Sequence, residues 1–245
     1  MINVVQLLHS RTEYLDRQLT CMKNQVVDDK ITYHLILNNP NLHDKHTEII
    51  ENKNLDFVKV SYADNSKICF ERFHYIKNNL LNNEFVIIMD DDQFISSDQV
   101  KELWNLRKKK TFVTWHGTVF TKDRIDMYTD WKYSFDHNHN PNNKKYSYGG
   151  PNFCVIDTEI FQPNSDLFFI EDMYPKSCRS MDDITLSWIC SKINWTIERS
   201  FVRPEIHIQR DSNSIACKLD GKKLKKYFVE LLDSIHPFVR YEEDN

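Results

Sequence analysis

The sequence FVIIMDDDQF, residues 85–94, places five apolar residues directly before three consecutive aspartates. The apolar run has the length and composition of a buried strand. Carboxylates at its end would repel each other by about 2 to 3 kcal/mol per pair at about 6 Å and an effective dielectric of about 20. Solvation of a turn would offset this repulsion, and so would a divalent cation, because hard cations bind carboxylate oxygens. The ten residues alone leave both explanations open.

The chain before this run alternates between predicted strands and helices. Strands are predicted at 3–8, 31–37, 57–60 and 85–89, and helices at 14–25, 43–52 and 68–81. Parallel strands need such crossovers, so the pattern predicts an α/β fold with a parallel sheet and helices on both faces. Ligands bind beyond the carboxyl ends of strands in such sheets, where Asp90–Asp92 lie. Alternation along an extended chain would direct Asp90 and Asp92 to one side and Asp91 to the other.

The pattern after residue 110 is less regular. We predict strand and turn at 111–120, a polar loop at 134–147, strands at 152–156 and 195–199, and helices at 181–192 and 221–235. The loop contains His137 and His139, which we interpret as part of a solvated excursion in preference to a metal site.

Composition limits the class of protein. With 245 residues, 40% of them hydrophobic, the chain can form one large domain or two closely joined halves. The net charge of −4 comes from interspersed charges and argues against a nucleic-acid partner. No apolar stretch approaches the roughly 20 residues of a membrane span, and the six cysteines are scattered without a C-x-x-C pair. We therefore expect a soluble, unprocessed, cytoplasmic protein with reduced thiols, and the sequence leaves its oligomeric state open.

Four features in a fixed order resemble the GT-A glycosyltransferases and, more loosely, the family 2-like inverting members of that fold. They are the Asp-x-Asp motif Asp90-Asp91-Asp92, the turn YGGPNFCVI at 148–156, the acidic pair in SMDDITLSWI at 180–189, and His207 in EIHIQR. The resemblance covers about residues 1–210. It implies a GT-A, Rossmann-like, mixed but mostly parallel sheet flanked by helices, in a single domain of two abutting halves.

The resemblance divides the chain into a nucleotide-binding half at 1–97, an acceptor-binding half at 98–220, and a C-terminal helix and tail at 221–245. Two positions depart from the family pattern. Only Arg11 matches the Tyr-Asn-Arg-like turn after the first strand, and the second strand ends in Asn38-Asn39 where an acidic pair is common. These departures leave recognition of the base open.

A nucleoside diphosphate leaves with its charge neutralised, and a divalent cation can act as the Lewis acid. The resemblance implies Mn²⁺ or Mg²⁺ as the cofactor. It makes Asp92 a direct ligand, places Asp90 near the ribose or the metal, and makes His207 a further ligand. A histidine in a strand-like segment can also simply be a hydrogen-bonded core or surface residue, so that alternative stays open for His207.

Inverting transfer also needs a base that takes the proton of the acceptor hydroxyl. Within the resemblance Asp183 is the favoured base and Asp182 the alternative. A structural explanation competes with both roles. Ser180 as N-cap would make Asp182 and Asp183 the second and third helical residues, where free N–H groups and the helix dipole stabilise carboxylates.

The remaining candidates surround the expected donor and acceptor. The nucleotide-sugar candidates are Arg11, Asn38, Lys67, Arg72, Asp90, Asp91, Gly149 and Gly150, and the acceptor candidates are Trp115, His116, Trp131 and Tyr148. Adjacent glycines allow close backbone approach or a positive φ. Aromatic faces suit the apolar faces of sugar rings. The alternatives are a solvated helix face for the basic residues, a simple turn for the glycines and core packing for the aromatics.

These features predict a metal-dependent glycosyltransferase that moves a sugar from a nucleotide-diphosphate sugar to a glycan or other hydroxyl acceptor, with inversion favoured. The alternatives are a nucleotidyltransferase, although no Gly-rich phosphate loop lies near the N-terminus, and a non-catalytic module that binds glycan or nucleotide. The lysines at 222–226 are interpreted as the solvated face of an amphipathic helix in preference to a peripheral membrane contact.

Overall fold

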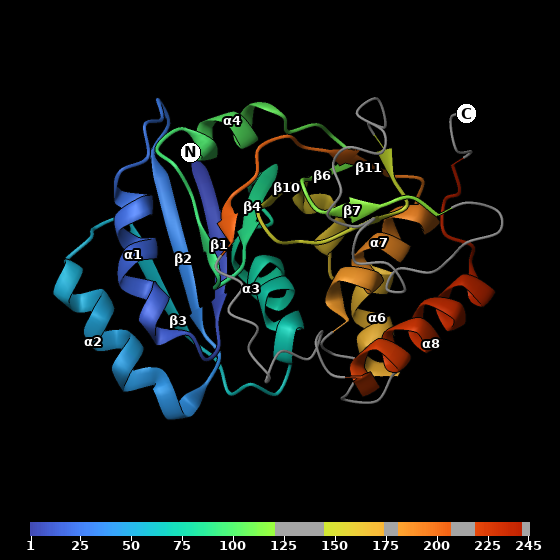
Figure 1. The fold of residues 1–245 in the computed structure, drawn as a ribbon, viewed down its shortest axis with the longest axis horizontal. Helices are drawn as coiled ribbons and strands as arrows, with labels where there is room; N and C mark the ends of the chain where they lie inside the picture. Colours follow the sequence, from blue (N-terminus) through green and yellow to red (C-terminus); the bar gives the residue numbers. More distant parts are fainter. Residues whose placement is uncertain (121–144, 174–180, 207–218, 242–245) are drawn as a thin grey trace.

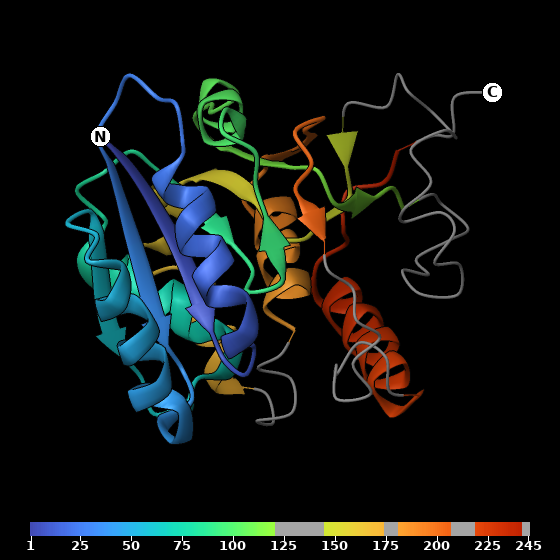
Figure 2. The ribbon, with the colours of Figure 1, turned by 60° about the vertical axis from the view of Figure 1, so that its left-hand side comes forward.

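The computed structural model of the protein describes residues 1–120, 145–173, 181–206 and 219–241. Its centre is an eight-stranded sheet of order β3-β2-β1-β4-β10-β6-β11-β8 with helices on both faces, shown in Figures 1 and 2. Strands from both predicted halves belong to this one sheet, because β4 pairs with β10. The predicted α/β class and the mixed, mostly parallel sheet are confirmed.

The N-terminal part contains four parallel strands whose positions follow the sequence pattern. They are β1 (Ile2–Leu8), β2 (Ile31–Leu37), β3 (Val58–Tyr62) and β4 (Phe85–Met89). The connections contain α1 (Thr12–Lys23), η1 (Pro40–Leu42), α2 (His43–Lys53), η2 (Ile68–Phe70) and α3 (Glu71–Asn79). Strands β2 and β4 lie on opposite sides of β1. The strand order therefore reverses between β1 and β4, and such a switch point is where open α/β sheets bind ligands.

The C-terminal part completes the sheet with β6 (Thr111–Thr114), β8 (Lys145–Tyr146), β10 (Cys154–Asp157) and β11 (Thr196–Arg199). Two small antiparallel pairs join β5 (Gln93–Phe94) to β12 (Glu205–Ile206) and β7 (Gly117–Thr118) to β9 (Tyr148–Gly149). Its helical segments are α4 (Gln99–Asn105), η3 (Thr158–Phe161), α6 (Asp166–Met173), α7 (Asp182–Lys192) and α8 (Leu219–Ile235). The sequence did not predict α4 and α6, which have seven and eight residues and are too short for a clear helical period.

A hydrophobic core covers each face of the sheet. The side chains of successive residues in a strand pack into the cores on opposite faces of the sheet, as those of Ile87 and Ile88 in β4 do. One core contains residues of α1, α2 and α4, and the other contains residues of α3, α6, α7 and α8. Because β4 is covered on both sides, its five residues are all apolar.

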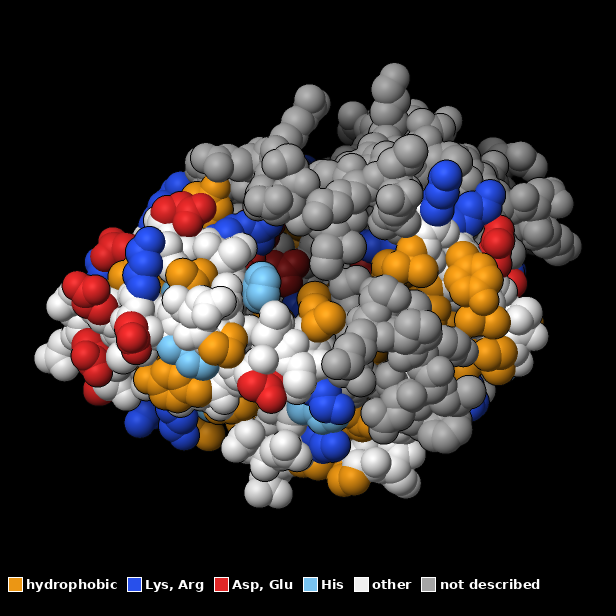
Figure 3. Space-filling model, turned by 90° about the horizontal axis from the view of Figure 1, so that it is seen from below, with side chains coloured by type: hydrophobic (Ala, Val, Ile, Leu, Met, Phe, Trp, Pro, Cys, Tyr) orange, Lys and Arg blue, Asp and Glu red, His pale blue; other side chains and the backbone are white. Residues whose placement is uncertain are grey.

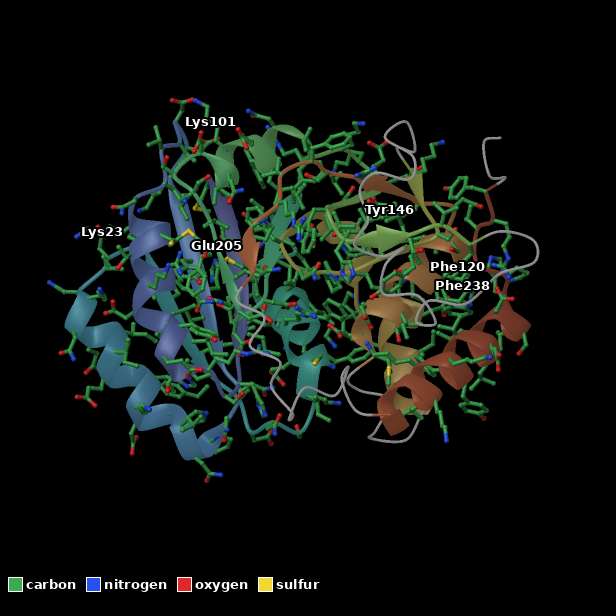
Figure 4. The ribbon with its side chains drawn as sticks, viewed as in Figure 1. Lys23, Lys101, Phe120, Tyr146, Glu205 and Phe238 are labelled. Atoms are coloured by element: carbon green, nitrogen blue, oxygen red, sulfur yellow. The ribbon has the colours of Figure 1, made fainter. Side chains whose placement is uncertain are left out.

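The end of the described chain packs against Phe120, which follows β7. The Phe238 ring lies 5.3 Å from the Phe120 ring, centroid to centroid, and Figure 4 shows the two side chains next to each other. The Tyr241 N–H donates a hydrogen bond to the Phe120 carbonyl at 3.0 Å. These contacts hold the segment that follows α8 against the rest of the domain.

Cys21, Cys69, Cys154 and Cys190, the cysteines assigned in the described ranges, are free thiols. No helix in the described part of the chain has both the length and the apolar character that a bilayer crossing needs.

Strand β2 buries an ionisable residue between the sheet and α3. His34 is 2% exposed, and its ring nitrogens lie 2.9 Å from the Tyr75 hydroxyl and 2.9 Å from Asn3 Oδ1. Burial, helped by the positive charge of Lys59, lowers the pKa of His34 from 6.5 to about 4. The folded protein therefore holds this imidazole neutral at pH values where the unfolded chain protonates it.

We expect protonation of His34 to weaken the fold in acid. The contribution of His34 is complete above about pH 6.5, where both states leave it neutral, and is lost as the pH falls towards about 4. Between about pH 7.5 and 4.5 the wild type should lose about 2 to 3 kcal/mol more unfolding free energy than His34→Gln. Urea denaturation at several pH values measures this difference. His9→Gln, at an exposed histidine, is the control, and equal pH slopes for wild type and His34→Gln would contradict the assignment.

Candidate active site

The switch point between β1 and β4 is the floor of the candidate site. The arrows of β1 and β2 point to the same end of the sheet in Figures 1 and 2, and Figure 3 views the molecule from that end. Near the centre of this face, acidic side chains lie at the bottom of a hollow beside basic and histidine side chains. Asp90–Asp92 follow β4 and His9–Arg11 follow β1, so both segments reach this end.

The backbone of the three aspartates forms a turn and is not extended. Residues 91 and 92 form the turn, and the carboxylates of Asp91 and Asp92 both face Arg11. Arg11 Nη1 pairs with Asp91 Oδ1 and lies 3.5 Å from Asp92 Oδ2. Asp91 Oδ2 also accepts a hydrogen bond from the His9 N–H at 3.3 Å. The predicted alternation, with Asp91 alone on one side, is wrong because the strand ends at Met89.

A buried glutamine holds the backbone of this turn. Gln6, in the middle of β1, donates from Nε2 to the Asp90 carbonyl at 2.9 Å and accepts a hydrogen bond from the Tyr33 hydroxyl. Gln93 Oε1 accepts the Asp90 N–H at 3.1 Å. The sequence analysis missed Gln6. Its signal was a polar residue within the apolar stretch NVVQLL, since a buried amide needs hydrogen-bond partners.

Arg72 joins the two acidic groups of the site. Its Nε and Nη2 donate to Asp182 Oδ2, with Nε at 2.8 Å, and its Nη1 lies 2.7 Å from Asp90 Oδ1. Nη1 also donates to the Pro151 carbonyl at 3.2 Å. The side chain is 7% exposed, so the alternative of a solvated helix face is wrong for Arg72. A guanidinium is stable in such a place only when carboxylates and carbonyls compensate its lost hydration.

The acidic pair opens α7, but the N-cap differs from the prediction. Met181 is the N-cap without a side-chain hydrogen bond, which makes Asp182 and Asp183 the first two helical residues. Ser180 lies outside the described residues. Asp182 is 3% exposed and directs its carboxylate to Arg72. Burial raises the pKa of Asp182 to about 6, although Arg72 opposes this shift.

Asp183 has a different environment from Asp182. The Tyr148 hydroxyl donates to Asp183 Oδ2 at 2.5 Å, Lys225 Nζ lies 3.6 Å from the same oxygen, and the Ile184 N–H donates to Oδ1 at 2.8 Å. Burial by itself would raise the pKa of Asp183, but Lys225, Tyr148, the Ile184 N–H and His116 together hold this pKa below its ordinary value. The site therefore contains adjacent carboxyl groups whose pKa values are shifted in opposite directions, a pattern typical of acid–base sites.

The two adjacent glycines are needed for close approach. A Cβ on Gly149 would lie 2.8 Å from the side chains of both Ile197 and Thr114, and a Cβ on Gly150 would lie 2.7 Å from His116 Nδ1. No glycine in the described ranges has a positive φ. Of the two predicted explanations, close backbone approach is therefore the right one. Gly149 N–H donates to Ser187 Oγ at 3.0 Å, which ties this turn to α7.

The predicted acceptor residues are buried to different extents. Tyr148 is 3% exposed and points to Asp183, and the half-buried His116 ring meets the Tyr148 ring edge-to-face at 6.2 Å. Trp115 is 2% exposed, and its Nε1 donates to the Asn152 carbonyl at 2.6 Å. Trp115 therefore packs in the core beneath His116. Trp131, His137, His139 and His207 lie outside the described residues.

Asn38 lies at the carboxyl end of β2, under the turn that contains Lys67. Its Nδ2 donates to Asn65 Oδ1 at 3.2 Å and to the Ile68 carbonyl at 3.0 Å. Asn65 and Ile68 have φ values of 63° and 50°, a region that a β-branched residue rarely adopts. Asn38 therefore supports a strained turn, and the half-buried Lys67 stands at the start of η2 beside it.

The charges of the site suit a divalent cation. Asp90, Asp91, Asp92 and Asp182 contribute four carboxylates, and Arg11 and Arg72 contribute two guanidiniums against them. Burial and then Asp90 raise the pKa of Asp92 to about 7, although Arg11 opposes this shift. The side chains of Asp90 and Asp92 keep 36% and 25% of their surface exposed. No three possible metal ligands converge within the described ranges, so the structure shows no complete metal site there.

No protein-family model and no curated protein match this chain. Among solved structures, residues 1–349 of TarS from S. aureus match with a TM-score of 0.50 and 15% identity, over 81% of this chain and 57% of that one. The mannosyltransferase PcManGT from Pyrobaculum calidifontis, solved with GDP-Man and Mn²⁺, matches with a TM-score of 0.56 and 12% identity, over 86% and 58%. The chain thus spans less than two thirds of these proteins' structures. Such identities establish the fold alone, and they confirm the predicted GT-A fold.

We expect replacement of Arg72 to destabilise the protein strongly. Arg72→Met would leave Asp90 and Asp182 without their shared guanidinium, at a cost of about 3 to 5 kcal/mol of unfolding free energy. Arg72→Lys should recover only part of this loss, because an ammonium cannot replace the planar fork that reaches both carboxylates. Urea denaturation measures both effects. The exposed Arg107, which donates to a nearby carbonyl, gives the control Arg107→Met. A loss below about 1 kcal/mol for Arg72→Met would show that the bridge contributes little.

Proposed function

We propose that this protein is a glycosyltransferase that moves a sugar from a nucleoside diphosphate sugar to a hydroxyl group of an acceptor. One observation carries the proposal. In a GT-A fold, the acidic turn Asp90–Asp92 at the switch point and the acidic pair Asp182–Asp183 are held together by a single buried arginine, Arg72. The similarity to the mannosyltransferase solved with GDP-Man and Mn²⁺ supports the same class of reaction.

The donor side would lie at the switch point. Asp90 and Asp92 are the residues that would hold Mn²⁺ or Mg²⁺, and a cation there would neutralise the diphosphate as it leaves. Arg11 and Asp91 keep the turn in place through their ion pair and the His9 N–H. Asn38 lies at the end of β2 and Lys67 lies in the turn that Asn38 contacts, where the nucleoside of the donor would extend from the switch point. We retain His207 as a proposed further ligand.

The acceptor side would lie at Asp183. In an inverting transfer the acceptor oxygen bonds to the anomeric carbon while the bond from that carbon to the diphosphate oxygen breaks. The electron pair of the broken bond leaves with the nucleoside diphosphate, and the acceptor proton moves to the Asp183 carboxylate. Tyr148 orients this carboxylate through its hydrogen bond of 2.5 Å. We favour Asp183 over Asp182 as the base because both Nε and Nη2 of Arg72 donate to Asp182 Oδ2.

We expect binding of a nucleoside diphosphate to require metal and Asp92. At a ligand concentration about 100-fold above Kd, the melting temperature should rise by about 5 °C or more, only when Mn²⁺ or Mg²⁺ is present. Asp92→Ala should abolish this shift by removing a metal ligand. Asp98→Ala, at an exposed carboxylate a few residues further on, should keep it. A full shift in Asp92→Ala, in a thermal-shift panel of nucleoside diphosphates, would remove Asp92 from the metal site.

We expect Asp183→Asn to separate binding from catalysis. The amide cannot accept the acceptor proton, so kcat should fall by about 10²- to 10⁴-fold while the metal-dependent thermal shift persists. Turnover is followed by release of the nucleotide from a panel of sugar nucleotides. Free nucleoside diphosphate supports the proposed reaction, whereas pyrophosphate would indicate a nucleotidyltransferase. Full turnover in Asp183→Asn would place the base elsewhere.

A further inference from the structure

One lysine of the C-terminal helix α8 is buried, although the sequence assigned the lysines of this helix to its solvated face. Lys225 is 7% exposed, whereas its neighbours Lys223 and Lys226 are exposed. Removing an ammonium group from water is unfavourable unless an opposite charge or hydrogen-bond acceptors compensate. Its burial therefore points to a specific role inside the domain.

The helix is fixed in position by contacts with α7. Lys225, Phe228 and Leu232 follow the spacing i, i+3 and i+7, which places the lysine on the apolar face of α8. Trp188 of α7 donates from Nε1 to the carbonyls of Leu232 and His236, both at 2.8 Å. Figure 1 shows α8 along one side of the domain, and its contacts are with α7. Because these contacts anchor the helix, the direction of the Lys225 side chain is set by the fold.

The ammonium group of Lys225 lies close to the carboxylate of Asp183, which we propose as the base. Its Nζ lies 3.6 Å from Asp183 Oδ2, the oxygen that also accepts the Tyr148 hydroxyl at 2.5 Å. The side chains of Lys225 and Asp183 are 8% and 16% exposed, so water screens their attraction only weakly. Three elements far apart in the sequence, β9, α7 and α8, therefore meet at one carboxylate oxygen.

We propose that Lys225 is a positioning residue of the active site, which holds the Asp183 carboxylate ionised and oriented, together with Tyr148, to take the proton of the acceptor hydroxyl. This inference rests on the proposed function. It makes the C-terminal helix part of the catalytic machinery, although α8 follows the sheet in the sequence and contributes no strand to it.

Several titratable groups face Asp183 from the surrounding elements. Asp182 precedes it on α7, Tyr148 comes from β9, His116 from the segment between β6 and β7, Cys69 from η2 and Lys225 from α8. Asp182 disfavours a second negative charge, whereas Lys225 favours it and is the largest of the influences that lower the pKa of Asp183. Without Lys225 the pKa of Asp183 should rise, since burial and Asp182 would then face less opposition.

The test compares Lys225→Met with Lys225→Arg and with the matched control Lys226→Met. Lys226 is the exposed next residue on the same helix, 4.0 Å from Glu230. Lys225→Met should lower kcat about tenfold or more and move the acidic limb of the kcat/KM profile to higher pH, since a larger fraction of Asp183 is then protonated. Lys225→Arg should restore the limb towards that of the wild type, and Lys226→Met should leave both quantities unchanged. Metal-dependent nucleotide binding should persist in all three variants.

Loss of activity without a moved limb would mean that Lys225 only supports the packing of α8, and this result would overturn the proposal. An unchanged kcat and limb in Lys225→Met would overturn it as well.

A second measurement does not depend on turnover. Titration of the ¹³C-labelled Asp183 carboxyl group by NMR, assigned with Asp183→Asn, should show a higher pKa in Lys225→Met than in the wild type and in Lys226→Met. If the wild type transfers no sugar from any donor but the NMR titration moves as expected, the pairing stands and the proposed function fails. If turnover is observed and the titration does not move, the function stands and the role of Lys225 is wrong.

Discussion

The guanidinium of Arg72 joins carboxylates that lie far apart in the chain and come from the two halves of the domain. Asp90 follows the strand at the switch point, and Asp182 begins the helix that packs beneath the second half. Burial of Arg72 and Asp182 is stable only when they are paired, because each would otherwise be a desolvated charge, and the partly exposed Asp90 adds a second carboxylate to the guanidinium. The same guanidinium also donates a hydrogen bond to the Pro151 carbonyl, which directly follows Gly149 and Gly150. The relative placement of the proposed donor and acceptor sides therefore depends on one side chain of α3.

This bridge also answers the question posed by three consecutive aspartates. Their repulsion is offset by two arginines, each on a different side of the turn, and not by solvent alone. The pKa of Asp92 is nevertheless raised to about 7 by its burial and by Asp90, although Arg11 opposes this shift. A site that keeps residual negative charge and partly exposed carboxylate oxygens is suited to a hard cation. The two arginines and a cation would thus together neutralise the negative charge of Asp90–Asp92.

The adjacent aspartates of α7 show how local position and tertiary environment separate equivalent residues. Both carboxyl groups are in the first turn of the helix. Asp182 turns to the arginine of the donor side, and Asp183 turns to Tyr148 and Lys225 of the acceptor side. Their pKa values consequently shift in opposite directions. The helix terminus explains why acidic residues are tolerated here, and only the partners explain their different chemistry.

The sequence by itself determined the strands and helices of the N-terminal half, because buried parallel strands need mostly apolar runs such as ITYHLIL and FVIIM, whose bounds agree with β2 and β4. It also determined that acidic residues gather at the carboxyl edge of that sheet. The tertiary structure alone decided what each of them contacts. The sequence analysis placed Lys225 on a solvated face and left that alternative open for Arg72, a nucleotide-sugar candidate, because charge signals solvent. The burial of both residues depends on carboxylates that approach from distant segments. The spacing of Lys225 with Phe228 and Leu232 indicated that the lysine lies on the apolar face of the helix. This spacing could not identify Asp183 as the partner, because ion pairing across the domain leaves no periodic pattern in the chain.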